Sequence, residues 1–312
     1  MALRLLAHVT YYDASVTAGV DSKTAAVKTS AAWREFNYHA VVRLLDEMEC
    51  SYDAFSHVAA VVDVNEGHSF QERLQSWRGG ACGGSGAGRG GDAGASSISA
   101  SSAASSSPSS SSATASARPG RVRSVSVVAH KLTHPFRLAW AHREHMVASL
   151  ESYDWFLSVE GDTLVPGRAM AAQVALAPRL YERHNMLLGF TRVVNDTLGN
   201  CFYSDIVKPA ASSTIVALDG LGRFVTPTNT YAAVWAYPRD IMRAFVKSAD
   251  WQPVLKTVRG MRERAAWGWR HGRIVTLVDE SALRIYHLGK SGQYHVKQRG
   301  HNAWPVEKLV AR

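Results

Sequence analysis

Residues 55–65 form a nearly continuous apolar run that is rich in β-branched side chains. A strand of this composition suits a parallel sheet in which both faces are covered. Residues 3–9 predict an earlier strand, and the apolar residues between the two strands repeat at helical spacing. The helical repeat consists of Trp33, Phe36, Ala40, Val41, Leu44, Leu45 and Met48. Together these segments predict a βαβ unit and therefore an α/β fold.

A low-complexity segment, residues 79–117, follows this unit. Of its 39 residues, 35 are Gly, Ala, Ser, Thr or Pro. Such a segment has too little apolar surface to offset roughly 1–2 kcal/mol of backbone entropy for each ordered residue. We therefore expect a disordered insertion on the surface.

The alternation of strands and helices resumes after the insertion. Residues 124–129 predict a strand, residues 142–153 a helix and residues 155–159 another strand. The residues before the insertion would by themselves form a parallel half-sheet with an exposed edge. One domain over residues 1–312 therefore explains the chain better than two.

The second half of the chain is less regular. Residues 168–182 predict a helix, and residues 213–217 with 223–225 predict a hairpin. A further helix is expected to start with Pro238 in its first turn, where the missing N–H costs nothing. Residues 290–312 are basic and without periodicity, so we expect a tail that wraps the surface.

Charge, cysteine content and hydropathy limit the ligands, disulfide bonds and membrane segments that we expect. The formal net charge is +9, which favours an anionic ligand over a cationic one. Three cysteines are too few for a disulfide framework, and no stabilising bridge is assumed. No stretch approaches the roughly 20 apolar residues of a membrane span, and charge interrupts the start too early for a signal peptide. We therefore expect a soluble chain.

The strand at residues 155–159 ends at two carboxylates, Glu160 and Asp162, with Gly161 between them. Ligands of open α/β sheets bind at the carboxyl ends of the strands. Two acids at that place can hold a hard divalent cation such as Mg²⁺ or Mn²⁺, which in turn binds a diphosphate. The alternative is a simple Glu-Gly-Asp turn between strands.

Cations and aromatic residues precede this motif, at residues 134–143. Arg143 could supply positive charge to a phosphate, and Trp140 could supply an apolar platform to a sugar or base. The alternative is an ordinary helix start in which Trp140 lies in the core and Arg143 is solvated.

Two motifs carry a resemblance to a known family. They read His-Pro-x-x-Leu-x-Trp-x-His-Arg at residues 134–143 and Tyr-Asp-x-Phe-x-x-x-Glu-x-Asp at residues 153–162. With the preceding βαβ unit, they resemble the nucleotide-sugar-dependent glycosyltransferases of the GT-A fold, above all a group of fungal, algal and giant-virus glycosyltransferase-like proteins. The resemblance spans residues 3–294 apart from the insertion. It implies a Rossmann-like GT-A three-layer sandwich with a mainly parallel central sheet.

The resemblance also implies a metal site. Asp162, with Glu160, would bind Mn²⁺ or Mg²⁺ bridging the donor diphosphate, and His287 would complete the coordination. The acidic motif of this group usually reads Glu-Asp-Asp, so Gly161 replaces an acid. This departure implies either a weaker metal affinity or a site in which Asp162 carries most of the coordination. A structural histidine at a strand end is the alternative for His287, and His295 is its rival.

A transferase that inverts the anomeric configuration also needs a base for the acceptor hydroxyl. Glu263 is the candidate, on an expected helix start that precedes aromatic residues. A solvated Glu263 paired with Arg262 or Arg264 is the ordinary alternative, and Asp240 and residues 279–280 are weaker candidates. A retaining enzyme needs no such base.

Residues at the ends of the first two strands are candidates for binding the nucleoside. Asp63 or Asn65 could hydrogen-bond a ribose or base, and Thr10 and Tyr12 could stack on or bond the same group. Asn229 matches the place where the resembled enzymes line the donor-sugar pocket, and a helix cap is its alternative.

The expected function is a metal-dependent transfer of a sugar from a nucleoside-diphosphate donor to a hydroxyl acceptor, on a glycan or glycoprotein. The alternatives are a non-catalytic binder of an anionic polymer, nucleic acid or sulfated glycan, and an inactive transferase-like protein. The basic residues are scattered and no nucleic-acid motif is present, so no nucleic-acid partner is expected. The resemblance implies the Golgi if an N-terminal anchor precedes this sequence, and otherwise the cytoplasm.

Overall fold

The computed structural model describes residues 2–12, 30–79, 82, 122–133, 137–195, 201–203, 215–226, 230–253, 261–271, 273–277 and 280–288. Its centre is a five-stranded sheet in the order β11-β4-β1-β2-β3. The strands are β1 (Leu3–Tyr11), β2 (Phe55–Asn65), β3 (Val122–His130), β4 (Trp155–Glu160) and β11 (Val234–Pro238). β1 pairs in parallel with β2 and β4, β2 pairs in parallel with β3, and β11 is antiparallel to β4. The predicted α/β class with a mainly parallel central sheet is confirmed.

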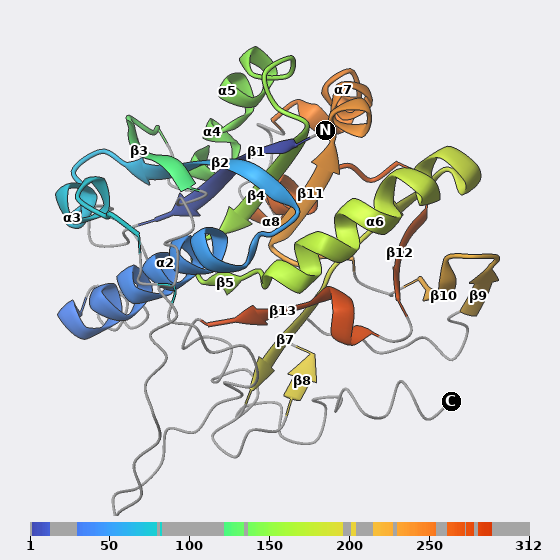
Figure 1. The fold of residues 1–312 in the computed structure, drawn as a ribbon. Helices are drawn as coiled ribbons and strands as arrows, with labels where there is room; N and C mark the ends of the chain where they lie inside the picture. Colours follow the sequence, from blue (N-terminus) through green and yellow to red (C-terminus); the bar gives the residue numbers. More distant parts are fainter. Residues whose placement is uncertain are drawn as a thin grey trace, which may run out of the picture.

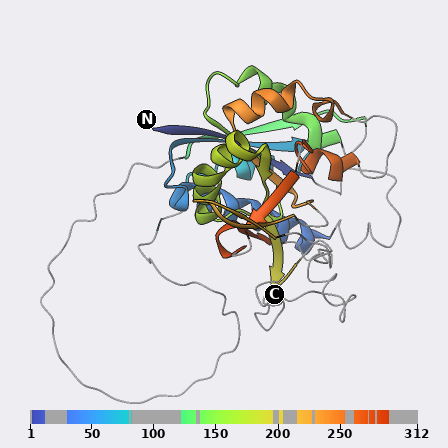
Figure 2. The ribbon, with the colours of Figure 1, turned by 90° about the vertical axis from the view of Figure 1, so that its right-hand side faces the viewer.

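Helices cover both faces of this sheet (Figures 1 and 2). Odd-numbered residues of β1, such as Leu5 and Val9, pack with α2 (Ala31–Ser51) and α6 (Gly167–His184) in one buried cluster. Leu6 packs with α5 (Arg143–Ala148) and α7 (Arg239–Val246) in another. Figure 2 shows α7 above the sheet and α2 below it. The α-helices are α2 (Ala31–Ser51), α3 (Gln71–Gln75), α4 (Leu138–Ala141), α5 (Arg143–Ala148), α6 (Gly167–His184), α7 (Arg239–Val246) and α8 (Met261–Ala266). This arrangement is the expected three-layer sandwich.

Two smaller four-stranded sheets flank the centre. One contains β6 (Met186–Leu188), β12 (Arg273–Leu277), β10 (Gly222–Val225) and β9 (Ile215–Leu218). The other contains β5 (Thr163–Leu164), β13 (Arg284–His287), β7 (Thr191–Asn195) and β8 (Cys201–Tyr203). Short 3₁₀-helices, η3 (Ala249–Trp251) and η4 (Glu280–Leu283), follow α7 and precede β13. Because β13 pairs with β5, the last described strand lies directly beside the residues that follow β4.

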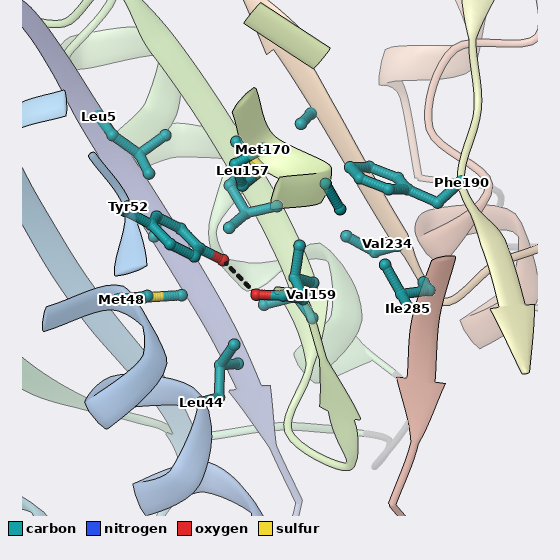
Figure 3. Packing of buried hydrophobic residues seen from close by; sticks show 14 of the residues in the cluster. Leu5, Leu44, Met48, Tyr52, Leu157, Val159, Met170, Phe190, Val234 and Ile285 are labelled. Atoms are coloured by element: carbon teal, nitrogen blue, oxygen red, sulfur yellow. Dashed lines mark hydrogen bonds between the residues drawn. The ribbon is translucent and has the colours of Figure 1, made fainter. Parts of the chain in front are cut away.

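The largest buried cluster joins α2 to the chain between β4 and α6 (Figure 3). Tyr52, at the end of α2, is fully buried, and its hydroxyl donates a hydrogen bond of 3.0 Å to the carbonyl of Val165. Burial raises the pKa of Tyr52 well above its ordinary value, so this hydroxyl stays a donor. The bond fixes α2 beside the turn that carries the acidic motif.

Most elements predicted from periodicity are confirmed, with small changes at their ends. Strands 3–9, 55–65 and 155–159 correspond to β1, β2 and β4, and the helical repeat corresponds to α2. The hairpin is present as β9 and β10, although residues 213 and 214 lie outside the described residues. Most of the insertion at 79–117 and the whole tail at 290–312 also lie outside them.

The predicted helix at residues 142–153 is wrong in its second half. α5 ends at Ala148, and the chain turns before β4. Asp154 explains the turn, because its carboxylate accepts a hydrogen bond of 2.9 Å from the Arg4 amide and one of 2.7 Å from the Arg239 guanidinium. These contacts start β4 in register with β1, which a continuing helix would prevent.

The sequence interpretation assumed no stabilising bridge, but the structure contains one disulfide. Cys50, in the last turn of α2, is bonded to Cys82, with a Cα–Cα distance of 5.4 Å. The Trp77 indole, which donates to Asp46 at 3.1 Å, holds the intervening chain against α2. The amide of Val122 donates to the Glu49 carboxylate at 2.7 Å. Cys82 and Val122, on the two sides of residues 83–121, therefore contact consecutive residues of α2.

In the described part of the chain, no helix is long and apolar enough to cross a membrane.

Candidate active site

The acidic motif lies at the carboxyl end of β4, as predicted. Its backbone is held on both sides: the Gly161 amide donates to the Thr10 carbonyl at 2.8 Å, and the Glu160 amide donates to the Ala233 carbonyl at 3.0 Å. Thr10 is the register partner of Glu160. The turn therefore rests between the end of β1 and the residue before β11.

Asp162 and His287 meet at this turn, although 125 residues separate them in sequence. The Nε2 atom of His287 lies 3.2 Å from the Oδ2 atom of Asp162. Pairing of β13 with β5 and a hydrogen bond of 2.7 Å from the Leu288 amide to the Asp162 carbonyl hold the two residues together. The Asp162 side chain is 30% exposed and that of His287 is 9% exposed, so the pair is accessible mainly from the Asp162 side.

Arg192 is a third member of the site, which the sequence interpretation missed. Its guanidinium donates to the Oδ1 atom of Asp162 at 3.2 Å from a side chain that is only 4% exposed. Arg192 lies on β7, which pairs in parallel with β13. The available signal was a charged residue within the apolar run of β7, because a buried arginine requires an anionic or polar partner.

Glu160 has different partners from Asp162. Its Oε1 atom accepts a hydrogen bond of 3.1 Å from the hydroxyl of Tyr231. The Tyr231 ring in turn lies edge-on to Trp267, with ring centroids 6.2 Å apart. The two acids of the motif therefore face two sets of residues, and aromatic rings border the site on the Glu160 side.

Asp162 and His287 suit a divalent cation whose other coordination positions are filled by a bound diphosphate and water. In the described residues, no group of three or more His, Cys, Asp and Glu side chains is arranged to hold a metal ion. Asp162 and His287 offer one carboxylate oxygen and one imidazole nitrogen within 3.2 Å of each other. Mg²⁺ typically takes one or two carboxylates and fills its other positions with phosphate oxygens and water, and Mn²⁺ also accepts imidazole. The residues present therefore fit a cation that arrives with a diphosphate.

Among the comparisons with known proteins, only the one with solved structures finds matches. Neither protein-family models nor curated proteins match the sequence. The chain is similar to a 4-diphosphocytidyl-2C-methyl-D-erythritol synthase, with 10% identity and a TM-score of 0.37 over 96% of this chain and 98% of that one. It is similar to TarS (residues 1–349) of S. aureus, with 10% identity and a TM-score of 0.38 over 99% of this chain and 70% of that one. It is also similar to an inositol-1-phosphate CTP transferase of T. maritima, with 11% identity and a TM-score of 0.34 over 97% and 99% of the two chains. A likeness at this level assigns no function.

The predicted contact of Asp63 with a ribose is not what the structure shows. Asp63 is 1% exposed, with one carboxylate oxygen 2.6 Å from His8 Nδ1 and the other 2.8 Å from His130 Nε2. Burial favours the neutral acid, but the hydrogen bonds from His130 and His8 outweigh it and hold the pKa of Asp63 well below its ordinary value. Both oxygens of Asp63 are therefore engaged inside the protein. Asn65 is buried as well, whereas Thr10 and Tyr12 are half-buried beside the acidic turn.

Arg143 is likewise engaged inside the protein and not presented to a phosphate. Its guanidinium lies over the rings of Trp140 and Trp251, 3.9 and 4.6 Å from their centroids, and donates to the carbonyls of Asp250 and Trp251. Burial lowers the pKa of Arg143 to about 9. The interpretation of Trp140 as core is confirmed, and Arg143 joins α5 to η3.

The side chains of most other candidate site residues lie outside the described part of the chain. Asn229 and His295 lie outside the described residues, as do the side chains of Glu263 and Glu280. The backbone of Glu263 belongs to α8, which confirms the expected helix but leaves its role a prediction. Asp240 pairs with Arg243 at 3.2 Å on the exposed side of α7.

Proposed function

We propose that this protein is a metal-dependent glycosyltransferase that moves a sugar from a nucleoside-diphosphate donor to a hydroxyl acceptor on a glycan or glycoprotein. The observation that carries the proposal is the pairing of Asp162 with His287 at the carboxyl end of β4. A simple turn between two strands requires neither a distant histidine nor a buried arginine at its acidic residue. The site instead gathers a carboxylate, an imidazole and a guanidinium.

Each residue of the site has a distinct task in this proposal. Asp162 and His287 hold Mn²⁺ or Mg²⁺, which when bound neutralises the charge that develops on the departing nucleoside diphosphate. Arg192 keeps the Asp162 carboxylate oriented by donating to its second oxygen. Tyr231 does the same for Glu160, which is then available at the edge of the same turn.

The donor and acceptor would approach from different sides of the turn. Thr10, near the end of β1, and Tyr12, just beyond it, would contact the nucleoside, since ligands of such sheets bind beyond the carboxyl ends of the strands. Trp267, beside Tyr231, offers an aromatic wall of the kind on which sugar rings pack. Asn229 at the donor sugar remains part of the proposal through the family resemblance. Glu263 remains the candidate base because it precedes aromatic residues on which a sugar could stack.

The proposal is tested by ligand-dependent stability. UDP or GDP with Mn²⁺ should raise the melting temperature, and a ligand at 100 times its dissociation constant stabilises by about 2.7 kcal/mol. The substitutions Asp162→Asn and His287→Ala should abolish the Mn²⁺-dependent part of the shift. Asp219→Asn, an exposed acid in the hairpin turn between β9 and β10, is the matched control and should leave the shift unchanged.

The outcome against the proposal is equally specific. Stabilisation by heparin or DNA, with no effect of nucleotide and Mn²⁺, would favour the binder of anionic polymers. A nucleotide shift without turnover of any nucleotide sugar would favour an inactive transferase. A screen of nucleotide sugars for Mn²⁺-dependent hydrolysis identifies the donor if the proposal holds.

A further inference from the structure

A histidine cluster lies on the α5 side of the central sheet, apart from the acidic turn. We use this name for His8 on β1, His130 on β3, and His142 and His145 at α5, with Asp63 of β2 between the first two. The Nε2 atom of His8 lies 3.0 Å from the Nδ1 atom of His145. None of these contacts takes part in the proposed transfer of a sugar.

Asp63 determines which nitrogen of His8 faces the rest of the cluster. Because its carboxylate accepts from Nδ1 at 2.6 Å, that nitrogen carries the proton, and Nε2 of the neutral ring presents its lone pair to His145. A carboxylate that accepts from one nitrogen of an imidazole while the other nitrogen binds a cation is the usual support of metal-ligating histidines. The His8 side chain is thus oriented as a metal ligand would be.

The spacing of the two facing nitrogens is also close to that of a metal site. At metal–nitrogen distances of about 2.0–2.1 Å, two imidazoles on one tetrahedral Zn²⁺ place their nitrogens about 3.3 Å apart. The observed 3.0 Å differs by a few tenths of an ångström. His145 is exposed, so an ion can reach this position from solvent and complete its coordination with water.

The buried ring of His142 is a second indication that an ion binds beside His8. His142 is 1% exposed, and neither of its ring nitrogens has a hydrogen-bond partner among the described residues. The ring lies next to His8, with centroids 5.7 Å apart. A buried polar group without a partner is costly, and such groups commonly mark the place of a water or ion. An ion or its bound water beside His8 would give this ring a partner.

We propose that the histidine cluster binds a divalent metal ion of the Zn²⁺ class between His8 Nε2 and His145 Nδ1. Two neutral imidazoles favour borderline ions such as Zn²⁺, Ni²⁺ or Cu²⁺ over Mg²⁺ or Ca²⁺, which prefer oxygen. The site is separate from Asp162 and His287, so it stands whether or not the protein transfers a sugar.

The experiment uses the full chain carrying Asp162→Asn, which weakens metal binding at the acidic turn. In equilibrium dialysis against Zn²⁺, adding His145→Ala should remove about one bound ion per chain and the associated rise in melting temperature. Because His145 is exposed, this variant should fold as its parent does without metal, which circular dichroism checks. His184→Ala, an exposed histidine at the end of α6, is the matched control and should retain both effects.

Two results would overturn the proposal. The first is that Zn²⁺ neither binds to nor stabilises the Asp162→Asn chain. The second is that His145→Ala binds as much Zn²⁺ as the His184→Ala control. Either result would leave His8 and His145 joined by an ordinary hydrogen bond.

Discussion

Gly161, in the middle of the acidic turn, lets the Val41 side chain of α2 approach the backbone that carries both carboxylates. A Cβ atom at this position would lie 2.9 Å from the Cγ2 atom of Val41 and 3.2 Å from the Thr10 carbonyl oxygen. The resembled enzymes usually have an acid here. In this protein the position is filled by its neighbours, so Asp162 and His287 carry the metal-binding character of the turn in the proposed function.

We predict that Gly161→Ala lowers the free energy of unfolding by about 1–3 kcal/mol, which is typical of overpacking a filled site. The measurement is urea denaturation. Gly161→Asp should be at least as destabilising and should not strengthen Mn²⁺ binding, because the added carboxylate has no room.

A double-mutant cycle identifies the cause of this loss. Val41→Ala removes the methyl group that the new Cβ would meet, at its own cost for the cavity that it leaves. The double variant should therefore be more stable than the sum of the two single losses predicts. Strict additivity of the two losses would show that the contact with Val41 is not the source of the effect.

At the scale of elements, the last turn of α2 is where several parts of the fold are joined. Glu49 accepts a hydrogen bond from the first residue of β3, and Cys50 is bonded to Cys82. Tyr52 donates a hydrogen bond to the carbonyl of Val165, just before α6. Gly167, the first residue of α6, has no room for a side chain, because a Cβ atom there would clash with the Ser51 carbonyl group. Stability of this junction should therefore affect the whole sandwich.

We predict that loss of the Cys50–Cys82 disulfide lowers the free energy of unfolding by about 2–4 kcal/mol, as expected for a loop of this length. The Cys50→Ser, Cys82→Ser double variant, or reduction of the natural chain, should show the loss in chemical denaturation. Cys201→Ser, which alters β8 and leaves the disulfide intact, is the control. Equal stability of oxidised and reduced chains would contradict a structural role for the bond.

At the scale of the whole molecule, described residues on the two sides of positions 83–121 are anchored at one place, the last turn of α2. Cys82 and Val122 contact consecutive residues of α2, and β3 then continues the central sheet in parallel with β2. The central sheet is thus built from strands that precede and follow residues 83–121. The single domain with an insertion stays a prediction.

We predict that replacing residues 83–121 by a short Gly/Ser linker leaves a chain that unfolds in one cooperative transition, with a melting temperature close to that of the parent. The closure entropy of a loop changes only slowly with its length, so shortening it should cost little. Calorimetry of both chains measures this. Two separate transitions in the parent, or failure of the shortened chain to fold, would instead indicate two domains.

Sequence patterns alone were sufficient for the elements of the central sheet and for the position of the acidic motif. The apolar run of β2, the helical repeat of α2 and the strand before Glu160 are local signals, because burial imposes a period on neighbouring residues. The same local signals correctly led to the α/β class.

Only the tertiary structure decided which side chains meet. The partners of Asp162 come from β7 and β13, and both oxygens of Asp63 are hydrogen-bonded to histidines from other strands. Strand pairing between distant segments creates these contacts, and no periodicity within a segment records them. For the same reason the Cys50–Cys82 bond could not be inferred from the number of cysteines.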